Sequence, residues 1–246
     1  MVQSRKPGLI LVDATTSSEH NFLVSTGANI IDVSILNQPN ANSQQLVPNQ
    51  ATPSDRAIIS YTSGSTGVPK GVPPSHSSYR NHVEIWVLVI RNASERWDAA
   101  TLFHLIDVYG PTDVTFGCAD NLVPLGSRAA DGNQEAWERQ QFGLFTLPNY
   151  AIYIHDTETR PVPVGTPGRV AVDGAGVSGG YLSETKLTAA AFLHDQYSGP
   201  FMNQRGWTVI HLTEDRGRID SQGRLHLEDR VRKSTLVKLG GIRVDL

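Results

Sequence analysis

The chain has 246 residues, of which 39% are hydrophobic and 18% are charged. This composition is that of an ordinary globular protein, and it excludes a collagen, a coiled coil and a wholly disordered chain. The 21 Lys and Arg residues nearly balance the 24 Asp and Glu residues, so we expect neither nucleic acid nor a membrane as a partner. No apolar run approaches the ~20 residues of a membrane-spanning helix, and the single Cys118 fits a reducing compartment. We therefore expect a cytoplasmic protein.

The first half of the chain is expected to mix strands with a helix. Residues 9–13 form an apolar run closed by an acid, which is typical of a buried parallel strand. Two further strands are expected, at residues 57–62 and 102–109. A helix is expected over residues 76–90, because Ser75 is a suitable N-cap and apolar residues follow at helical spacing.

The second half is expected to consist mostly of strands. Two strands are predicted at residues 150–154 and 169–172, separated by a segment rich in turn residues. A short helix is predicted over residues 183–192, with Ser183 as its N-cap. Residues 208–246 alternate short apolar runs with turns that contain Asp, Gly and Arg, which predicts antiparallel hairpins.

The segment YTSGSTGVPKG at residues 61–71 carries a dense set of groups that can bind an anion. Glycine lets the backbone turn sharply and approach a phosphate closely. Backbone N–H groups, hydroxyls and the ammonium group of Lys70 can then donate hydrogen bonds to it. The segment is not a Walker A loop, because Lys70 follows Pro69 and precedes Gly71 rather than Ser or Thr. The alternative is a solvated turn between two elements.

Five segments of the chain resemble, in the same order, the core motifs of the adenylate-forming (acyl-adenylate synthetase) superfamily. The likeness is greatest to the adenylation domains of nonribosomal peptide synthetases. The segments are YTSGSTGVPKG at 61–71, YGPTD at 109–113, GAGVSGGYL at 174–182, LTEDRG at 212–217 and KLGGIRVDL at 238–246. The segment LPNY at 147–150 looks closest to the synthetase portions of fungal hybrid polyketide–peptide enzymes.

The resemblance implies a fold and a reaction. The fold is α/β and forms part of the family's large N-terminal domain, with an α/β layered sheet over residues 1–148 and a β-rich, barrel-like subdomain over residues 149–246. The family's C-terminal lid domain is expected to be absent. The reaction is the activation of a carboxylic acid, an amino acid in the synthetases, by ATP and Mg²⁺ to an acyl-adenylate and pyrophosphate. The acyl group then passes to a thiol, usually the phosphopantetheine arm of a carrier domain.

Carried over position by position, the resemblance also implies roles for individual residues. The loop from Thr62 to Lys70 would hold the β- and γ-phosphates, Asp113 would bind Mg²⁺, and Asp215 would bind the ribose. Thr66, Lys70 and Asp113 are the candidate catalytic residues. The candidate nucleotide-binding residues are Thr62, Ser63, Gly64, Ser65, Thr66, Gly67, Lys70, Tyr109, Gly110, Thr112, Asp215 and Arg230, with Arg232 as the alternative to Arg230.

Some of these residues have simpler interpretations. Asp113 can be the acid of a turn after Pro-Thr, and Asp215 can be the acid of a hairpin. Residues 174–179 match the dinucleotide fingerprint Gly-x-Gly-x-x-Gly, but no helix opens at the third glycine and no strand ending in an acid follows, so a tight turn is the better interpretation. A dinucleotide-dependent enzyme is thus a minor hypothesis. We interpret Cys118 as a packing residue.

The chain also departs from the family pattern. Only about 40 residues separate Gly71 from Tyr109, whereas the family's longer interval supplies most of the acyl-binding pocket. We also expect the lysine of the lid domain to be absent, together with the domain that carries it. The departures in single residues are Asp113 for Glu, Glu214 for Gly, Leu236 for Gln and Gly240 for Arg. We therefore expect an impaired or inactive enzyme, with a non-catalytic module that binds ATP or AMP as the alternative.

Overall fold

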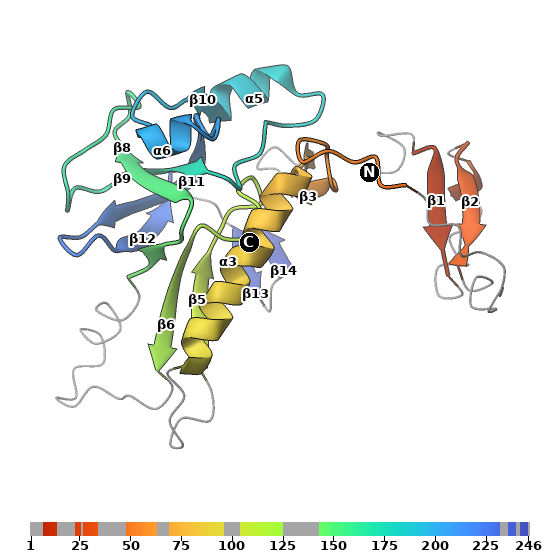
Figure 1. The fold of residues 1–246 in the computed structure, drawn as a ribbon. Helices are drawn as coiled ribbons and strands as arrows, with labels where there is room; N and C mark the ends of the chain where they lie inside the picture. The colour runs from red at the N-terminus through yellow and green to blue at the C-terminus, as the bar shows by residue number, and fades with distance from the viewer. Residues whose placement is uncertain are drawn as a thin grey trace. The chain divides into compact units, whose positions relative to one another are not determined.

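The computed structural model describes residues 7–13, 23–25, 27–33, 48–62, 69–95, 104–124, 143–231, 236–239 and 242–245. The chain divides into two compact units, Met1–Ala51 and Thr52–Leu246. Their secondary structure is drawn in Figure 1. The expected division after residue 148 stays a prediction.

The first unit contains a two-stranded sheet. Strands β1 (Leu9–Val12) and β2 (Asn29–Asp32) pair in parallel, which confirms the predicted parallel strand at residues 9–13. Its predicted burial is only half right, because alternate side chains of a strand point to opposite faces. Val12 is buried, whereas Leu9 and Leu11 are 51% and 61% exposed.

The centre of the second unit is a five-stranded antiparallel sheet (Figure 1). Its strands follow the order β10-β11-β9-β8, and β12 also pairs with β11. The strands are β8 (Tyr150–His155), β9 (Gly168–Gly174), β10 (Phe192–His194), β11 (Val209–Ile219) and β12 (Leu225–Arg230). A separate hairpin joins β13 (Leu236–Leu239) to β14 (Ile242–Asp245). The strands and hairpins predicted in the second half are therefore confirmed.

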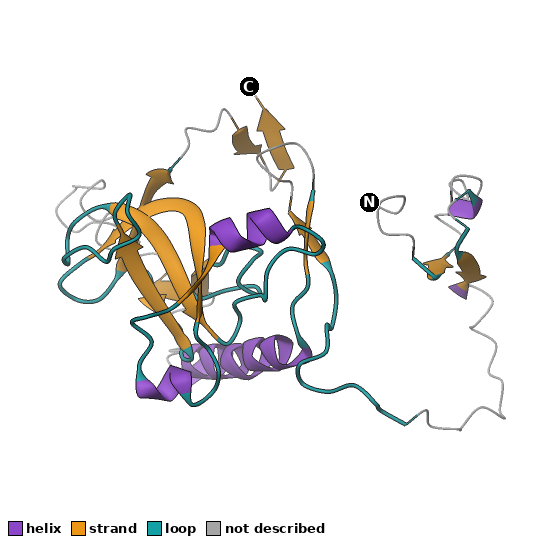
Figure 2. Cartoon of the chain, turned by 90° about the horizontal axis from the view of Figure 1, so that it is seen from above, coloured by secondary structure: helices purple, strands orange, loops and turns teal. Residues whose placement is uncertain are grey.

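The same unit contains a second sheet and a long helix, which is the longest purple helix in Figure 2. The sheet contains β5 (His104–Tyr109), β6 (Ala119–Pro124) and β7 (Phe145–Thr146). The helix α3 (His76–Glu95) extends five residues beyond its predicted end. Its predicted cap is confirmed, because the backbone N–H of Ser78 donates a hydrogen bond of 3.1 Å to Ser75 Oγ.

A short antiparallel hairpin precedes α3. Its strands are β3 (Ser60–Thr62) and β4 (Lys70–Val72), so the strand predicted at residues 57–62 begins three residues later than expected. Residues 63–68, which connect the two strands in the sequence, lie outside the described residues. The ends of the predicted phosphate loop, Thr62 and Lys70, are paired with each other.

Two short helices lie between β9 and β11. They are α5 (Thr185–Ala191) and α6 (Pro200–Asn203). The prediction that Ser183 caps α5 is wrong: the N-cap position falls on Glu184, which makes no side-chain cap hydrogen bond. Ser183 instead has a φ of +63° and belongs to the turn that precedes the helix.

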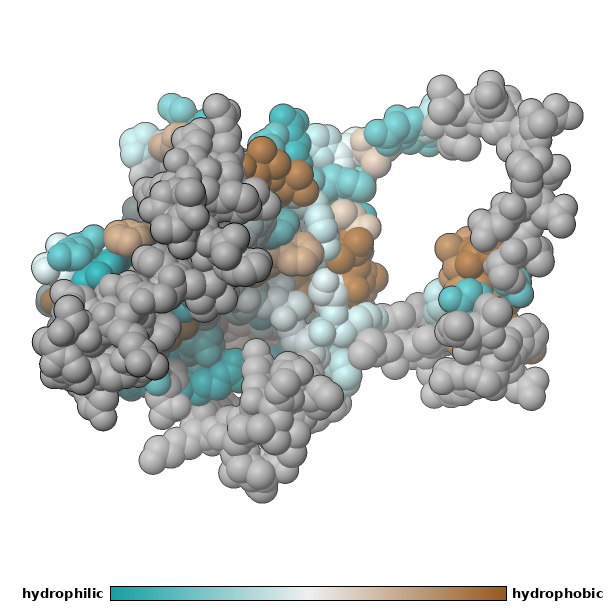
Figure 3. Space-filling view, turned by 90° about the horizontal axis from the view of Figure 1, so that it is seen from below, coloured by the Kyte–Doolittle hydropathy of each residue, from teal (hydrophilic) through white to brown (hydrophobic). Residues whose placement is uncertain are grey.

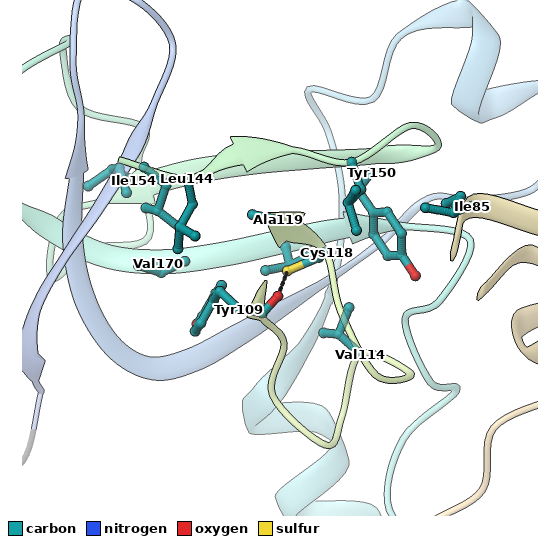
Figure 4. Packing of buried hydrophobic residues seen from close by; sticks show 12 residues of the cluster. Ile85, Tyr109, Val114, Cys118, Ala119, Leu144, Tyr150, Ile154 and Val170 are labelled. Carbon is teal, nitrogen blue, oxygen red and sulfur yellow. Dashed lines mark hydrogen bonds between the residues drawn. The ribbon is translucent and has the colours of Figure 1, made fainter. Parts of the chain in front are cut away.

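The main hydrophobic core joins α3 to both sheets (Figure 4). Cys118 is fully buried in it, and its thiol donates a weak hydrogen bond to the carbonyl oxygen of Tyr109 at 3.6 Å. Burial raises the pKa of this thiol to about 12. The interpretation of Cys118 as a packing residue is confirmed. The members of the core are Ile85, Tyr109, Val114, Cys118, Ala119, Leu144, Leu147, Tyr150, Ile154, Val170, Val172 and Leu225.

A smaller core lies on the opposite face of the five-stranded sheet. Its buried members are Ala171, Ile210 and Leu212. Ala171 alternates along β9 with Val170 and Val172 of the main core, as the two faces of a strand require. The molecular face in Figure 3 mixes hydrophilic and hydrophobic residues. Within the part of the chain that the structure describes, no helix is long and apolar enough to cross a membrane.

Candidate functional site

Asp215 of β11 is held by two residues that are distant from it in sequence. Tyr109, at the end of β5, donates a hydrogen bond from its hydroxyl to Asp215 Oδ2 at 2.9 Å. Arg230 of β12 donates from Nε to Asp215 Oδ1 at 3.1 Å. Each carboxylate oxygen keeps a second lone pair, and the side chain is 19% exposed, so Asp215 can accept further hydrogen bonds from a ligand.

Tyr109 remains a hydrogen-bond donor in this arrangement. Burial raises the pKa of Tyr109, and the nearby charge of Asp215 adds to the increase. The phenol therefore keeps its proton at neutral pH and can hold Asp215 in one orientation.

The backbone around Asp215 is fixed by an irregularity in β11. The pairing of β11 with β9 shifts between Leu212 and Arg216, which changes the direction of the side chains that follow. Thr213 Oγ1 donates to the carbonyl oxygen of Val170 at 2.8 Å and accepts from the N–H of Asp215 at 3.1 Å. Arg169 donates from Nε to the carbonyl oxygen of Thr213 at 2.6 Å.

Asp113 lies beside the same strand. Its Oδ2 is 3.5 Å from Nε2 of His211, four residues before Asp215 on β11. Within the described part of the chain, Asp113 Oδ1 is buried and accepts no hydrogen bond. Burial lowers the pKa of His211, against the opposite effect of the Asp113 charge. A buried carboxylate oxygen without a partner is costly, so this atom is suited to bind a cation or a donor from a ligand.

The glycine-rich segment at residues 174–182 connects these parts. The backbone N–H of Ser178 donates to the carbonyl oxygen of Asp113 at 3.0 Å, and that of Leu182 donates to the carbonyl oxygen of Gly71 at 2.8 Å. The ammonium group of Lys70 lies 4.8 Å from the ring centroid of Tyr181. The segment thus contacts both the predicted phosphate hairpin and the turn that carries Asp113. Its interpretation as a tight turn fits a hydrogen bond of 3.1 Å from the N–H of Val177 to the carbonyl oxygen of Gly174.

The structure brings several of the predicted site residues together. Tyr109 and Arg230 contact Asp215 directly. Asp113 reaches the same strand through His211. Arg232, the alternative to Arg230, lies outside the described residues, as do the five predicted residues of the loop, Ser63, Gly64, Ser65, Thr66 and Gly67.

For two of the predicted nucleotide-binding residues, Thr112 and Gly110, the surroundings do not indicate a ligand. Thr112 is exposed. At Gly110 a Cβ atom would collide with the backbone carbonyl of Phe116. Glycine is required there by the close approach of two backbone segments, whether or not a ligand is bound.

Sequence reasoning missed three residues of this region, His211, Tyr181 and Arg169. His211 gave a weak signal, because it interrupts the apolar run at residues 209–212. Tyr181 and Arg169 gave none, since their contacts join segments that are distant in sequence. Among the described residues, no group of three or more His, Cys, Asp or Glu side chains could hold a metal ion.

Comparison with known proteins identifies the family. The model of the AMP-binding enzyme family matches residues 5–104 and 89–182. The chain therefore belongs to the AMP-binding enzymes. A fungal relative, a polyketide synthase-nonribosomal peptide synthetase of Aspergillus clavatus, is 28% identical over 343 residues. This match covers 100% of the chain but only 8% of the relative, and it confirms the likeness to fungal hybrid synthetases.

Solved structures confirm the fold class as mixed α/β, with mostly sheet and few helices. ATP-bound MatB from Rhodopseudomonas palustris superposes with a TM-score of 0.65 at 16% identity, covering 99% of this chain and 63% of that one. McyG A-PCP complexed with phenylalanyl-adenylate gives a TM-score of 0.61 at 19% identity, covering 96% and 50%. At these identities the likeness shows the fold alone.

The chain is shorter than its relatives within the matched span. The alignment with the Aspergillus clavatus protein has 343 positions against 246 residues here, a difference of 97. The two matches to the family model overlap at residues 89–104. The expectation that the shortening falls between Gly71 and Tyr109 stays a prediction.

Proposed function

We propose that this chain binds ATP and activates a carboxylic acid as an acyl-adenylate. The observation that carries the proposal is the contact of Asp215 with Tyr109 and Arg230, which brings two family segments and a third predicted nucleotide-binding residue together at one carboxylate. Membership of the AMP-binding family supports the same ligand.

The ribose of the nucleotide is assigned to Asp215. Its two oxygens already accept hydrogen bonds, from Tyr109 and Arg230, and each retains one lone pair. Two neighbouring ribose hydroxyls can donate to these lone pairs at once. Because the carboxylate is oriented before the ligand arrives, binding requires little further ordering.

The magnesium ion is assigned to Asp113. Carboxylate oxygens are the ligands that Mg²⁺ prefers in proteins, usually together with substrate phosphates and water. The buried Oδ1 atom, which has no hydrogen-bond partner among the described residues, fits this role. When bound, Mg²⁺ neutralises phosphate charge and so permits attack by a carboxylate. Asp113 is one methylene shorter than the family's Glu, which predicts weaker metal binding.

The phosphates are assigned to Lys70 and the hairpin tip, residues 63–68. Lys70 follows the tip on β4 and pairs with Thr62, so both ends of the loop are fixed by the sheet. The ammonium group would stabilise negative charge that develops on the leaving pyrophosphate. Thr66 is proposed to donate a hydroxyl to the same phosphates.

The acyl substrate is proposed to be an amino acid that is passed to a carrier thiol. The likeness to a complex named McyG A-PCP, which holds phenylalanyl-adenylate, supports an acid of this class and a carrier domain as partner. The 97 positions that the chain lacks favour a second candidate. In that case the chain binds ATP or AMP without activating an acid.

The direct test is acid-dependent exchange of labelled pyrophosphate into ATP, measured with amino and aryl acids. The proposed activity predicts exchange that Lys70→Met and Asp215→Asn both reduce by about a hundredfold. Glu158→Gln, on an exposed turn after β8, serves as a matched control and should retain exchange. Binding of ATP by calorimetry without exchange for any acid would instead support the non-catalytic module.

A further inference from the structure

We propose that Tyr181 is a positioning residue that holds the ammonium group of Lys70 in place for the outer phosphates of ATP. This inference rests on the proposed function, since it assumes that the hairpin binds ATP. No comparison assigns a role to Tyr181, which lies about 110 residues after Lys70 in the sequence.

The ring of Tyr181 attracts Lys70 without neutralising it. The ammonium nitrogen is 4.8 Å from the ring centroid, inside the range of about 6 Å in which a cation is attracted by an aromatic face. A carboxylate in the same place would form an ion pair and compete with phosphate for the charge. An aromatic face limits the motion of the long lysine side chain and leaves its full positive charge for the ligand.

Tyr181 itself is fixed by its neighbours. Its backbone N–H donates to Thr188 Oγ1 of α5 at 2.9 Å, and its ring meets that of Phe192 edge-to-face, with 5.2 Å between centroids. The preceding Gly180 has a φ of +122°, and a Cβ atom there would collide with the side chain of Thr188. The chain therefore approaches α5 closely at this point, which gives the ring a defined place.

The experiment compares binding of MgATP and of AMP to the full chain by calorimetry. Tyr181→Phe keeps the aromatic face, whereas Tyr181→Leu removes it and leaves a smaller apolar side chain. Tyr197→Leu, an exposed tyrosine on the far side of the five-stranded sheet, is the matched control. AMP lacks the outer phosphates, so its affinity reports structural damage alone. Lys70→Met and the double variant with Tyr181→Leu test whether the two residues act together.

We expect Tyr181→Leu to lower the affinity for MgATP about fivefold and to leave the affinity for AMP unchanged. Tyr181→Phe and Tyr197→Leu should bind both nucleotides like the wild type, and Tyr181→Leu should cause no further loss in the Lys70→Met background. The role of Tyr181 is overturned if Tyr181→Leu leaves the affinity for MgATP unchanged, or lowers the affinities for MgATP and AMP equally. The proposed function still stands in that case if Lys70→Met lowers the affinity for MgATP. Absence of nucleotide binding by the wild type overturns both.

Discussion

Acidic residues on the two faces of the five-stranded sheet have opposite environments. On the face toward β5, Asp215 is partly exposed and accepts hydrogen bonds on both carboxylate oxygens. On the other face, Asp173 of β9 is fully buried beside Asp195, which accepts a hydrogen bond from Tyr153. Burial raises the pKa of Asp173, and the neighbouring Asp195 adds to the increase.

The contrast separates an acid that can bind a ligand from one that contributes to the fold. The carboxylate of Asp215 is oriented by two donors and can accept more hydrogen bonds, whereas burial beside a second carboxyl group favours the protonated form of Asp173. The size of the pKa shift alone would have indicated Asp173 as the functional residue. The donors around Asp215 and its exposure identify the better candidate.

The largest expected effect concerns the packing beneath each face. Leu225 is 1% exposed in the main core, and Leu212 is 3% exposed in the smaller core. Leu225→Ala should lower the free energy of unfolding by about 3 kcal/mol. Leu212→Ala should cost less, since fewer buried side chains surround it. Denaturant unfolding measures both, and a larger loss for Leu212→Ala would show that the second face carries the stability.

The second face should contribute a distinct pH dependence to the stability. The pKa of Asp173 is raised to about 7, above the ordinary value of about 4 for Asp. Asp173 therefore keeps its proton in the folded protein between these values, and its contribution to stability falls as the pH rises from about 4 to about 7. Charged or titratable neighbours in this region are Asp195, Tyr153, His155 and Arg169.

Replacing Asp173 tests this assignment. Asp173→Asn should raise the midpoint of thermal unfolding by about 4 °C at pH 8 and leave it unchanged at pH 4. Asp156→Asn, in the exposed turn after β8, is a control whose pKa is shifted downward by hydrogen bonds from the turn. Equal shifts at both pH values would mean that Asp173 carries no proton in the folded protein.

A smaller effect is expected from the hydroxyl that orients Asp215. Tyr109→Phe removes one hydrogen bond, of 2.9 Å, but leaves the ring in the core and Arg230 in contact with the carboxylate. The free energy of unfolding should fall by about 1 kcal/mol, and affinity for ATP by about threefold. If calorimetry shows that Tyr109→Phe has the same affinity for ATP as the wild type, Tyr109 does not contribute to ligand binding.

The sequence predicted the family and most strands, but not the side-chain contacts of the site. The strands at residues 150–154 and 169–172 and the cap at Ser75 follow from local patterns. The approach of His211 to Asp113 depends on the register of β11 and on how the turn after β5 packs against it. No local pattern encodes these long-range relations. Ser183 was misassigned for a similar reason, because the positive φ it adopts is not a feature of its residue type.

The central claim is that Asp113 and Asp215 serve one nucleotide. The most direct measurement is the affinity of the full chain for ATP and for AMP, by calorimetry with and without Mg²⁺. Asp215→Asn should lower the affinity for both nucleotides at least tenfold. Asp113→Asn should lower only the affinity for ATP and abolish the effect of Mg²⁺ on it. Normal binding of MgATP by both variants would contradict the claim, and the two acids would then be parts of the fold alone.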